Sequence, residues 1–98
     1  MLLIFSTFPS KKEAEAPAEN AVKKGLAKCA NIFPCSSIYK WKGKIQNEKE
    51  WVLELKASEK KYAEIESLLL KSHPYELPAI YAIKAERISG KFNAWIRD

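Results

Sequence analysis

Two long strand-like segments joined by one tight turn constrain this chain more than any other feature. Cys29–Trp41 is an extended segment interrupted near Pro34, and Lys44–Ala57 alternates apolar and charged residues toward its end. Lys42-Gly43 between them is typical of a hairpin turn. Each arm is about twice the usual five or six residues of a strand. The pattern therefore predicts a β-hairpin whose tip extends beyond the sheet from which it starts.

The N-terminal third predicts a buried strand followed by a helix. Leu2–Phe8 is an almost continuous apolar run, which favours a strand buried on both faces. Ser10 and Glu13 have the spacing of a capping box, which marks a helix start. Pro17 predicts a kink or an irregular first half in this helix, and Gly25 followed by leucine predicts its end.

The C-terminal third predicts a second helix, a strand and a short last helix. Ser58 is the expected cap of the second helix, and residues 79–86 and 89–97 form the last strand and helix. The inner face of the second helix is expected to carry Tyr62, Ile65, Leu68, Leu69 and Ser72. The order strand, helix, strand, strand, helix, strand predicts an α+β fold, a ferredoxin-like βαββαβ sandwich with both helices on one face of an antiparallel sheet.

Composition limits the possible classes of protein. The 98 residues suit a single domain, 1–98, and the apolar fraction of 47% favours a folded globule. The net charge of +5 comes from interleaved charges, as in residues 11–13, which favours a mixed surface over a nucleic-acid interface. No apolar run is long enough to cross a membrane, and Leu2–Phe8 lacks the basic start of a signal peptide. Cys29 and Cys35 are about 20 Å apart on one extended strand, so free thiols and a cytosolic location are expected.

The hairpin also predicts self-association. An isolated hairpin is marginal in water, and this one carries apolar side chains at its tip: Ile38, Tyr39, Trp41 and Ile45. We therefore expect other copies of the chain to cover it. The alternative is a hairpin folded back on its own domain at Pro34.

A short loop bounded by two prolines is the first candidate site. Pro74 and Pro78 enclose the loop after the second helix, next to His73, the chain's one histidine. Imidazole suits copper and zinc, and a metal site needs about four ligands. One chain offers His73, Glu76 and, from elsewhere, Cys29, so neighbouring subunits would supply the rest. The alternatives are that His73 caps the helix end and that Cys29 is a packed apolar residue.

Four segments resemble the CutA divalent-cation-tolerance proteins. Residues 25–32, GLAKCANI, resemble the KLAACVNI segment of that family, and residues 37–45, SIYKWKGKI, resemble its SIYWWEGKI hairpin. Residues 55–57, LKA, are similar to IKT, and residues 73–80, HPYELPAI, are similar to HPYEVPEI. The spacing also matches over nearly the whole chain.

This resemblance implies a ferredoxin-like homotrimer related in architecture to the PII signalling proteins, with copper or other divalent cations as ligands and no obligatory cofactor. In such a trimer a cleft between subunits would be lined by Tyr39, Trp41, Lys56, Tyr75 and Trp95 and closed by His73 and Glu76. Packing between subunits is the alternative role of these aromatic residues.

The chain departs from the family pattern at three positions. Ser6 and Ser72 stand where some members carry a cysteine and a second histidine, and both changes remove metal ligands. Lys42 replaces the usual hairpin glutamate. We therefore expect metal binding to be weak or shared between subunits, with small-ligand signalling without a physiological metal as the alternative function.

Two other functions of this topology are disfavoured. An RNA-recognition module needs a glycine and paired aromatics on its third strand, where residues 50–56 read EWVLELK. An acylphosphatase-like enzyme needs an arginine after the first strand, yet the chain's arginines are Arg87 and Arg97. We therefore expect a binding protein that is not an enzyme.

Overall fold

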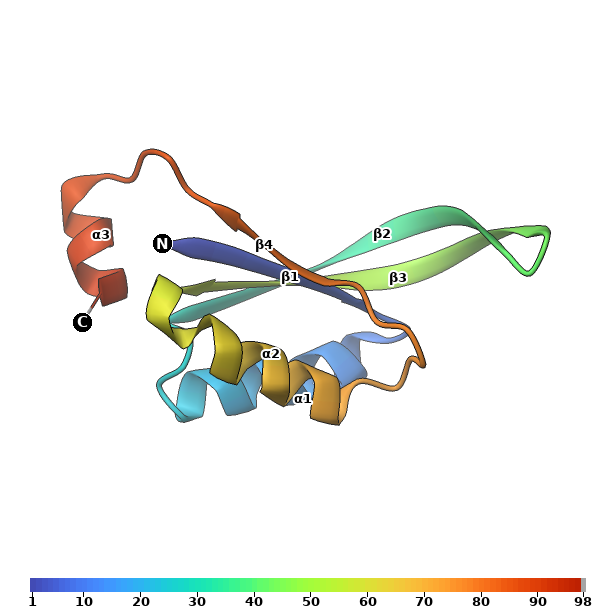
Figure 1. Cartoon of the computed structure of the whole chain (residues 1–98), viewed down its shortest axis with the longest axis horizontal. Coiled ribbons are helices and arrows are strands. Elements are labelled where there is room, and N and C mark those ends of the chain that lie inside the picture. Colours follow the sequence, from blue (N-terminus) through green and yellow to red (C-terminus); the bar gives the residue numbers. More distant parts are fainter. Residues whose placement is uncertain (98) are drawn as a thin grey trace.

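The computed structural model describes residues 1–97 and contains a four-stranded sheet with helices on one face (Figure 1). The strands are antiparallel in the order β2-β3-β1-β4. This order confirms the predicted ferredoxin-like βαββαβ sandwich. The elements along the chain are β1 (Leu2–Phe8), α1 (Lys11–Lys23), β2 (Cys29–Trp41), β3 (Lys44–Ala57), the 3₁₀ turn η1 (Glu59–Lys61), α2 (Tyr62–Ser72), β4 (Ile80–Lys84) and α3 (Gly90–Arg97).

Local signals set both ends of α1. Ser10 Oγ accepts a hydrogen bond from the Glu13 N–H at 3.1 Å, as the capping box predicts. At the other end, the Leu26 N–H donates to the Ala21 carbonyl at 2.9 Å and the Gly25 N–H donates to the Val22 carbonyl at 3.0 Å. These are the two bonds of a Schellman motif, and Gly25 has the positive φ of 72° that the motif requires.

Three expectations for the helices are wrong. The helix α1 is not irregular in its first half: it is unbroken from Lys11 to Lys23, with Pro17 on its buried face. Ser58 makes no side-chain capping bond, because the chain enters α2 through the turn η1 and α2 begins only at Tyr62. Ser72 is exposed, and its hydroxyl donates to the Leu68 carbonyl at 2.8 Å instead of facing the core.

The core lies between the helices and one face of the two central strands. On β1, the buried residues Ile4, Ser6 and Phe8 alternate with half-buried ones, so the expected burial on both faces is not seen. The reason is that α1 and α2 cover only one face of the sheet, while α3 lies beyond its end (Figure 1). The core cluster consists of Ile4, Phe8, Ala14, Ala18, Ala21, Leu26, Ala27, Leu53, Leu55, Ala57, Ile65 and Leu69.

The hairpin extends beyond the rest of the sheet, as predicted. β2 and β3 pair from Cys29↔Lys56 to Trp41↔Lys44, but β1 pairs only with the Trp51–Ala57 part of β3. The outer part of the ribbon therefore projects to one side in Figure 1 and gives the molecule a long axis of 46 Å. Ile38 and Ile45 near the tip are each 70% exposed. β2 continues through Pro34, which pairs with Trp51, so the hairpin does not fold back there.

Two further expectations concern the cysteines and the helices. Cys29 and Cys35 are both free thiols, as predicted from their separation along one strand. Within residues 1–97, none of the helices combines the length and the apolar character needed to span a bilayer.

Candidate functional site

The loop after α2 lies against the end of β1 and the base of the hairpin. The helix ends at Ser72, and His73 adopts an extended conformation with φ −78° and ψ 132°. This is the conformation that the following Pro74 favours. The imidazole is thereby directed back onto β1, where its ring stacks on Phe8 with centroids 4.2 Å apart.

Both ring nitrogens of His73 already have hydrogen-bond partners. Nδ1 accepts from the Tyr75 N–H at 3.2 Å, so in the neutral ring Nε2 carries the proton and donates to Ser6 Oγ at 3.0 Å. Burial lowers the pKa of His73, although a backbone hydrogen bond to Thr7 and the nearby carboxylates oppose the shift. The structure therefore favours a neutral imidazole in one tautomer, whose ligation of a metal requires loss of an existing hydrogen bond.

Two phenol–carboxylate pairs lie near this loop: one joins the loop to β3, and the other joins the two strands of the hairpin. The Tyr75 hydroxyl donates to Glu50 Oε2 at 2.5 Å, and Glu50 is only 9% exposed. Burial and the bond to Glu50 raise the pKa of Tyr75. On the hairpin the Tyr39 hydroxyl donates to Glu48, which raises the pKa of Tyr39. Both phenols therefore remain protonated donors at neutral pH and orient the carboxylates.

These residues surround a concave region that we call the hairpin-base pocket. Its volume is about 430 Å³. Its lining contains three aromatic side chains and two carboxylates, and within the described part of the chain it contains no lysine or arginine. Four of the predicted site residues, Tyr39, Trp41, Tyr75 and Glu76, come together here. The remaining lining residues are Thr7, Glu50, Leu77 and Ala79.

Three predicted site residues lie at the opposite end of the sheet. Cys29 pairs with Lys56 across the hairpin, and Lys56 pairs with Leu3 on β1, whereas His73 contacts Phe8. Leu3 and Phe8 are five positions apart on β1, or about 17 Å. The Lys56 ammonium is held by Glu54 at 2.6 Å. Trp95, on α3, lies 5.6 Å from the Lys28 ammonium.

A single chain therefore does not build the expected metal site. Within residues 1–97, no three histidine, cysteine, aspartate or glutamate side chains come close enough to hold a metal ion. His73 and Glu76 share the loop after α2, while Cys29 lies at the far end of the sheet. Any site that uses all three residues requires another subunit.

The sequence reasoning missed the roles of Ser6 and Glu50. Ser6 is a polar residue inside an apolar strand run, and its 1% exposure calls for a buried partner, which is His73. This signal was present in the sequence. Glu50 has the opposite phase to the buried Leu53 and Leu55, so strand alternation alone predicts an exposed side chain.

A family model confirms the resemblance. The model described as CutA1 divalent ion tolerance protein matches residues 2–98. The chain belongs to this family. Among curated CutA proteins, the "Divalent-cation tolerance protein CutA" of Thermotoga maritima is 39% identical over 98 residues, which cover all of this chain and 97% of the relative.

Solved structures of CutA proteins share the fold. The structure described as the periplasmic divalent cation tolerance protein CutA from Archaeoglobus fulgidus is 39% identical, with a TM-score of 0.93 over 98% of this chain and 95% of that one. The PII-like protein CutA from Nostoc sp. PCC 7120, in its apo form, is 26% identical, with a TM-score of 0.91 over 99% and 94% of the two chains. The CutA1 fold predicted from the sequence is thus confirmed.

Proposed function

We propose that this CutA1-family chain is a homotrimeric divalent-cation-tolerance protein of the cytoplasm. It binds copper or another divalent cation weakly, at clefts between its subunits. The observation that carries the proposal is the hairpin-base pocket. One chain brings two carboxylates to it but supplies an incomplete ligand set. Ligands from a second copy would complete the site.

Two exposed apolar surfaces support the self-association. The hairpin tip exposes Ile38, Trp41 and Ile45. The sheet face without helices leaves Tyr81 and Ile83 exposed on the edge strand β4. Exposed apolar ribbons and open strand edges are surfaces that proteins normally cover. A trimer would cover them without any further partner.

The side chains of the loop after α2 support weak binding. Glu76 is exposed in the hairpin-base pocket, so its carboxylate can accept a cation from solvent. To bind a metal, His73 must first break its hydrogen bond to Ser6 or to the Tyr75 N–H. The cost of breaking that bond makes the free energy of metal binding less favourable. Cys29 would have to come from a neighbouring subunit. The cytoplasmic location is supported by the free thiols of Cys29 and Cys35.

A copper titration of the chelator-treated protein tests the metal site. We expect Glu76→Gln and His73→Ala to weaken copper binding about tenfold each, as loss of one ligand implies. Glu86→Gln, an exposed carboxylate outside the hairpin-base pocket, is the matched control and should bind like the wild type. Equal affinities for all four proteins would remove His73 and Glu76 from the site.

Light scattering tests the assembly. We expect the wild type to have the mass of three chains and Trp41→Asp to shift the mass toward one chain, because a carboxylate would replace an apolar contact of the hairpin. Lys40→Asp also introduces a carboxylate into the hairpin but keeps the indole, and should remain trimeric. A monomeric wild type, or a Trp41→Asp variant that is fully trimeric at micromolar concentration, would contradict the proposed interface.

The second candidate function is that of a PII-like protein that binds a small ligand in the same cleft and has no physiological metal. The lining of Tyr39, Trp41 and Tyr75 with two carboxylates favours it, since aromatic faces and carboxylates together suit an organic ammonium ion. Tetramethylammonium, added to metal-free protein, should shift the Trp41 indole resonance in NMR spectra. A response to this cation with no copper affinity would favour this function over metal binding.

A further inference from the structure

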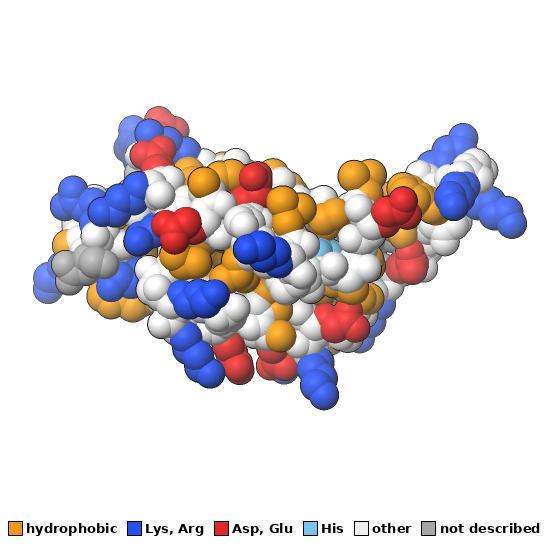
Figure 2. All heavy atoms as spheres, turned by 60° about the horizontal axis from the view of Figure 1, so that its bottom comes forward, with side chains coloured by type: hydrophobic (Ala, Val, Ile, Leu, Met, Phe, Trp, Pro, Cys, Tyr) orange, Lys and Arg blue, Asp and Glu red, His pale blue; other side chains and the backbone are white. Residues whose placement is uncertain are grey.

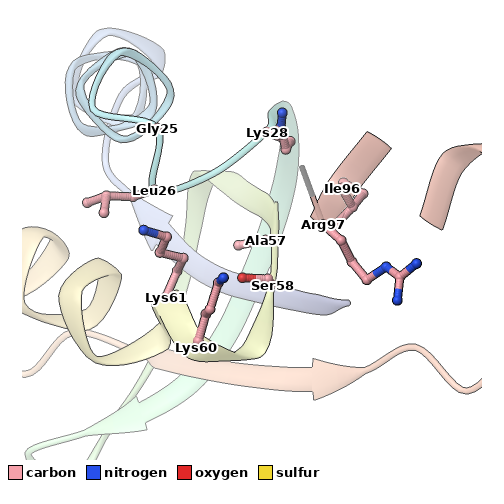
Figure 3. Close-up of a pocket in the computed structure, with 9 residues that line it drawn as sticks. All are labelled: Gly25, Leu26, Lys28, Ala57, Ser58, Lys60, Lys61, Ile96 and Arg97. Atoms are coloured by element: carbon pink, nitrogen blue, oxygen red, sulfur yellow. The ribbon is translucent and has the colours of Figure 1, made fainter. Parts of the chain in front are cut away.

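A second concave region lies at the other end of the molecule, near α3. It is a pocket of about 250 Å³ where the loop after α1, the turn η1 and the last turn of α3 meet (Figure 3). The residues that matter for its chemistry are Lys28, Ser58, Lys60, Lys61, Ile96 and Arg97. We call it the basic pocket. It shares no lining residue with the hairpin-base pocket.

The four cations of the basic pocket have no carboxylate partner among the described residues. The ion pairs within residues 1–97 are Lys56–Glu54 and Lys84–Glu59. Glu59 is the carboxylate nearest in sequence to the lysines of η1, and it is turned toward Lys84 at 3.3 Å. Figure 2 shows many basic side chains at the end of the molecule that carries α3, with a few acidic ones among them, and a second group of basic side chains at the tip of the hairpin. Within residues 1–97, no ion pair therefore balances the charge of this pocket.

The walls of the basic pocket are held in place by the fold. The Lys28 N–H donates to the Lys56 carbonyl at 2.9 Å, and the Lys28 ammonium lies 5.6 Å from the Trp95 ring. Ile96 is 2% exposed and anchors the last turn of α3, from which Arg97 extends. The cations thus come from separate elements that packing keeps together.

The donors in the basic pocket match phosphoryl oxygens. Lysine ammonium groups act as point charges toward phosphate, and the arginine fork can bond two phosphate oxygens at once. The Ser58 hydroxyl makes no capping bond to η1 and is a further donor. Figure 3 shows the Lys60 side chain extending back toward Ser58. Four cations exceed what one phosphate dianion neutralises, whereas a diphosphate carries three to four negative charges.

We infer that the basic pocket binds a small polyanion with two or more phosphoryl groups, such as a free diphosphate or the diphosphate part of a larger soluble ligand. The small volume favours such a compact group over a nucleic-acid backbone or a membrane, which require extended basic surfaces. Such a ligand places its negative charge among Lys28, Lys60, Lys61 and Arg97 and links the turn η1 to α3. This site is separate from the cleft of the proposed function.

Calorimetric titration of the full chain with inorganic pyrophosphate, in about 0.1 M potassium chloride, tests the inference. We expect Lys60→Gln and Arg97→Gln each to weaken pyrophosphate binding about tenfold, the effect of losing one charge-assisted hydrogen bond. Lys60→Arg keeps the charge and should retain binding. Lys12→Gln removes one exposed charge from α1, outside the basic pocket, and is the matched control.

Two results would overturn the inference: no heat of binding with pyrophosphate, or an equal loss of affinity in Lys12→Gln, which would indicate a general attraction of anions to a cationic protein. Sulfate, with a single dianionic centre, should bind more weakly than pyrophosphate. Glu76→Gln should leave pyrophosphate binding unchanged. A negative result of the copper titration can therefore be distinguished from a negative result of the pyrophosphate titration.

Discussion

Removing the Tyr75 hydroxyl tests how firmly the hairpin is connected to the loop after α2. In Tyr75→Phe the ring remains beside His73, at a centroid distance of 5.1 Å, but Glu50 loses its hydrogen bond of 2.5 Å. Glu50 is 9% exposed, so water cannot fully replace the lost donor. A hydrogen bond to a charged group contributes about 1.5–3 kcal/mol. We therefore expect the free energy of unfolding to fall by about 2 kcal/mol.

Urea unfolding followed by tryptophan fluorescence measures this change. For a domain of about 100 residues, 2 kcal/mol corresponds to a decrease in Tm of roughly 8–16 °C, which differential scanning calorimetry would also detect. Both proteins must be compared at the same concentration, because assembly adds a concentration-dependent term. Tyr81→Phe is the matched control: it removes a hydroxyl that makes no hydrogen bond within residues 1–97 and keeps the ring that stacks on Phe5. The Tyr81→Phe change should lower the free energy of unfolding by less than about 0.5 kcal/mol.

The pH dependence gives an independent check on the same bond. The pKa of Tyr75 is raised in the folded chain above its ordinary value of 10.0, so the folded state holds this proton more tightly than the unfolded state. The stabilisation is fully present below pH 10 and is lost progressively as pH rises above it. The stability difference between wild type and Tyr75→Phe should therefore shrink above about pH 10.

A double-mutant cycle with Glu50→Gln isolates the pair. We expect a coupling free energy of about 1 kcal/mol between positions 50 and 75, since both single changes remove the same charge-assisted bond. Equal unfolding midpoints for Tyr75→Phe and Tyr81→Phe, or a coupling free energy of zero, would show that the Tyr75–Glu50 contact does not stabilise the hairpin base.

Two further predictions concern His73. Burial lowers the pKa of His73 from its ordinary 6.5, so the neutral imidazole stabilises the fold above about pH 6.5, and this stabilisation is lost as the pH falls below that value. His73→Gln should therefore make the urea unfolding midpoint less dependent on pH. If the midpoint of the variant changed with pH as much as that of the wild type, the buried neutral imidazole would be contradicted. Ser6 Oγ lies 3.0 Å from His73 Nε2, so Ser6→Cys places a thiol beside the imidazole. It should raise the affinity for zinc and copper about tenfold or more in a competition titration, whereas Ser89→Cys, at an exposed serine outside the hairpin-base pocket, should not.

Local sequence signals predicted most of the secondary structure. The hydrogen bonds of Ser10 and Gly25 at the ends of α1 join residues only a few positions apart, so the spacing of these residues in the sequence predicts them. The Lys42-Gly43 turn is similar: both residues have positive φ, and the register of β2 and β3 follows from it. The Ser58 prediction failed because a 3₁₀ turn, rather than the α-helix, follows this serine.

Site geometry was harder to predict because strand alternation assigns a residue to a face and not to an end of the sheet. His73, Glu76 and Cys29 are all plausible metal ligands by type. The pairing of Cys29 with Lys56, and of Lys56 with Leu3, puts Cys29 at the opposite end of the sheet from His73. Tyr39, Trp41, Tyr75 and Glu76 did come together, because the outer part of the hairpin and the loop after α2 lie at the same end of the sheet (Figure 1).

The amino-acid sequence alone determined the order of the elements, the length of the hairpin and the family, since these depend on spacing along the chain. Tertiary structure alone decided which polar groups meet. It paired Ser6 with His73 and Glu50 with Tyr75, and it gathered Lys28, Lys60 and Arg97 around one pocket. These contacts join residues far apart in the chain, so they exist only after the strands have paired and the helices have packed.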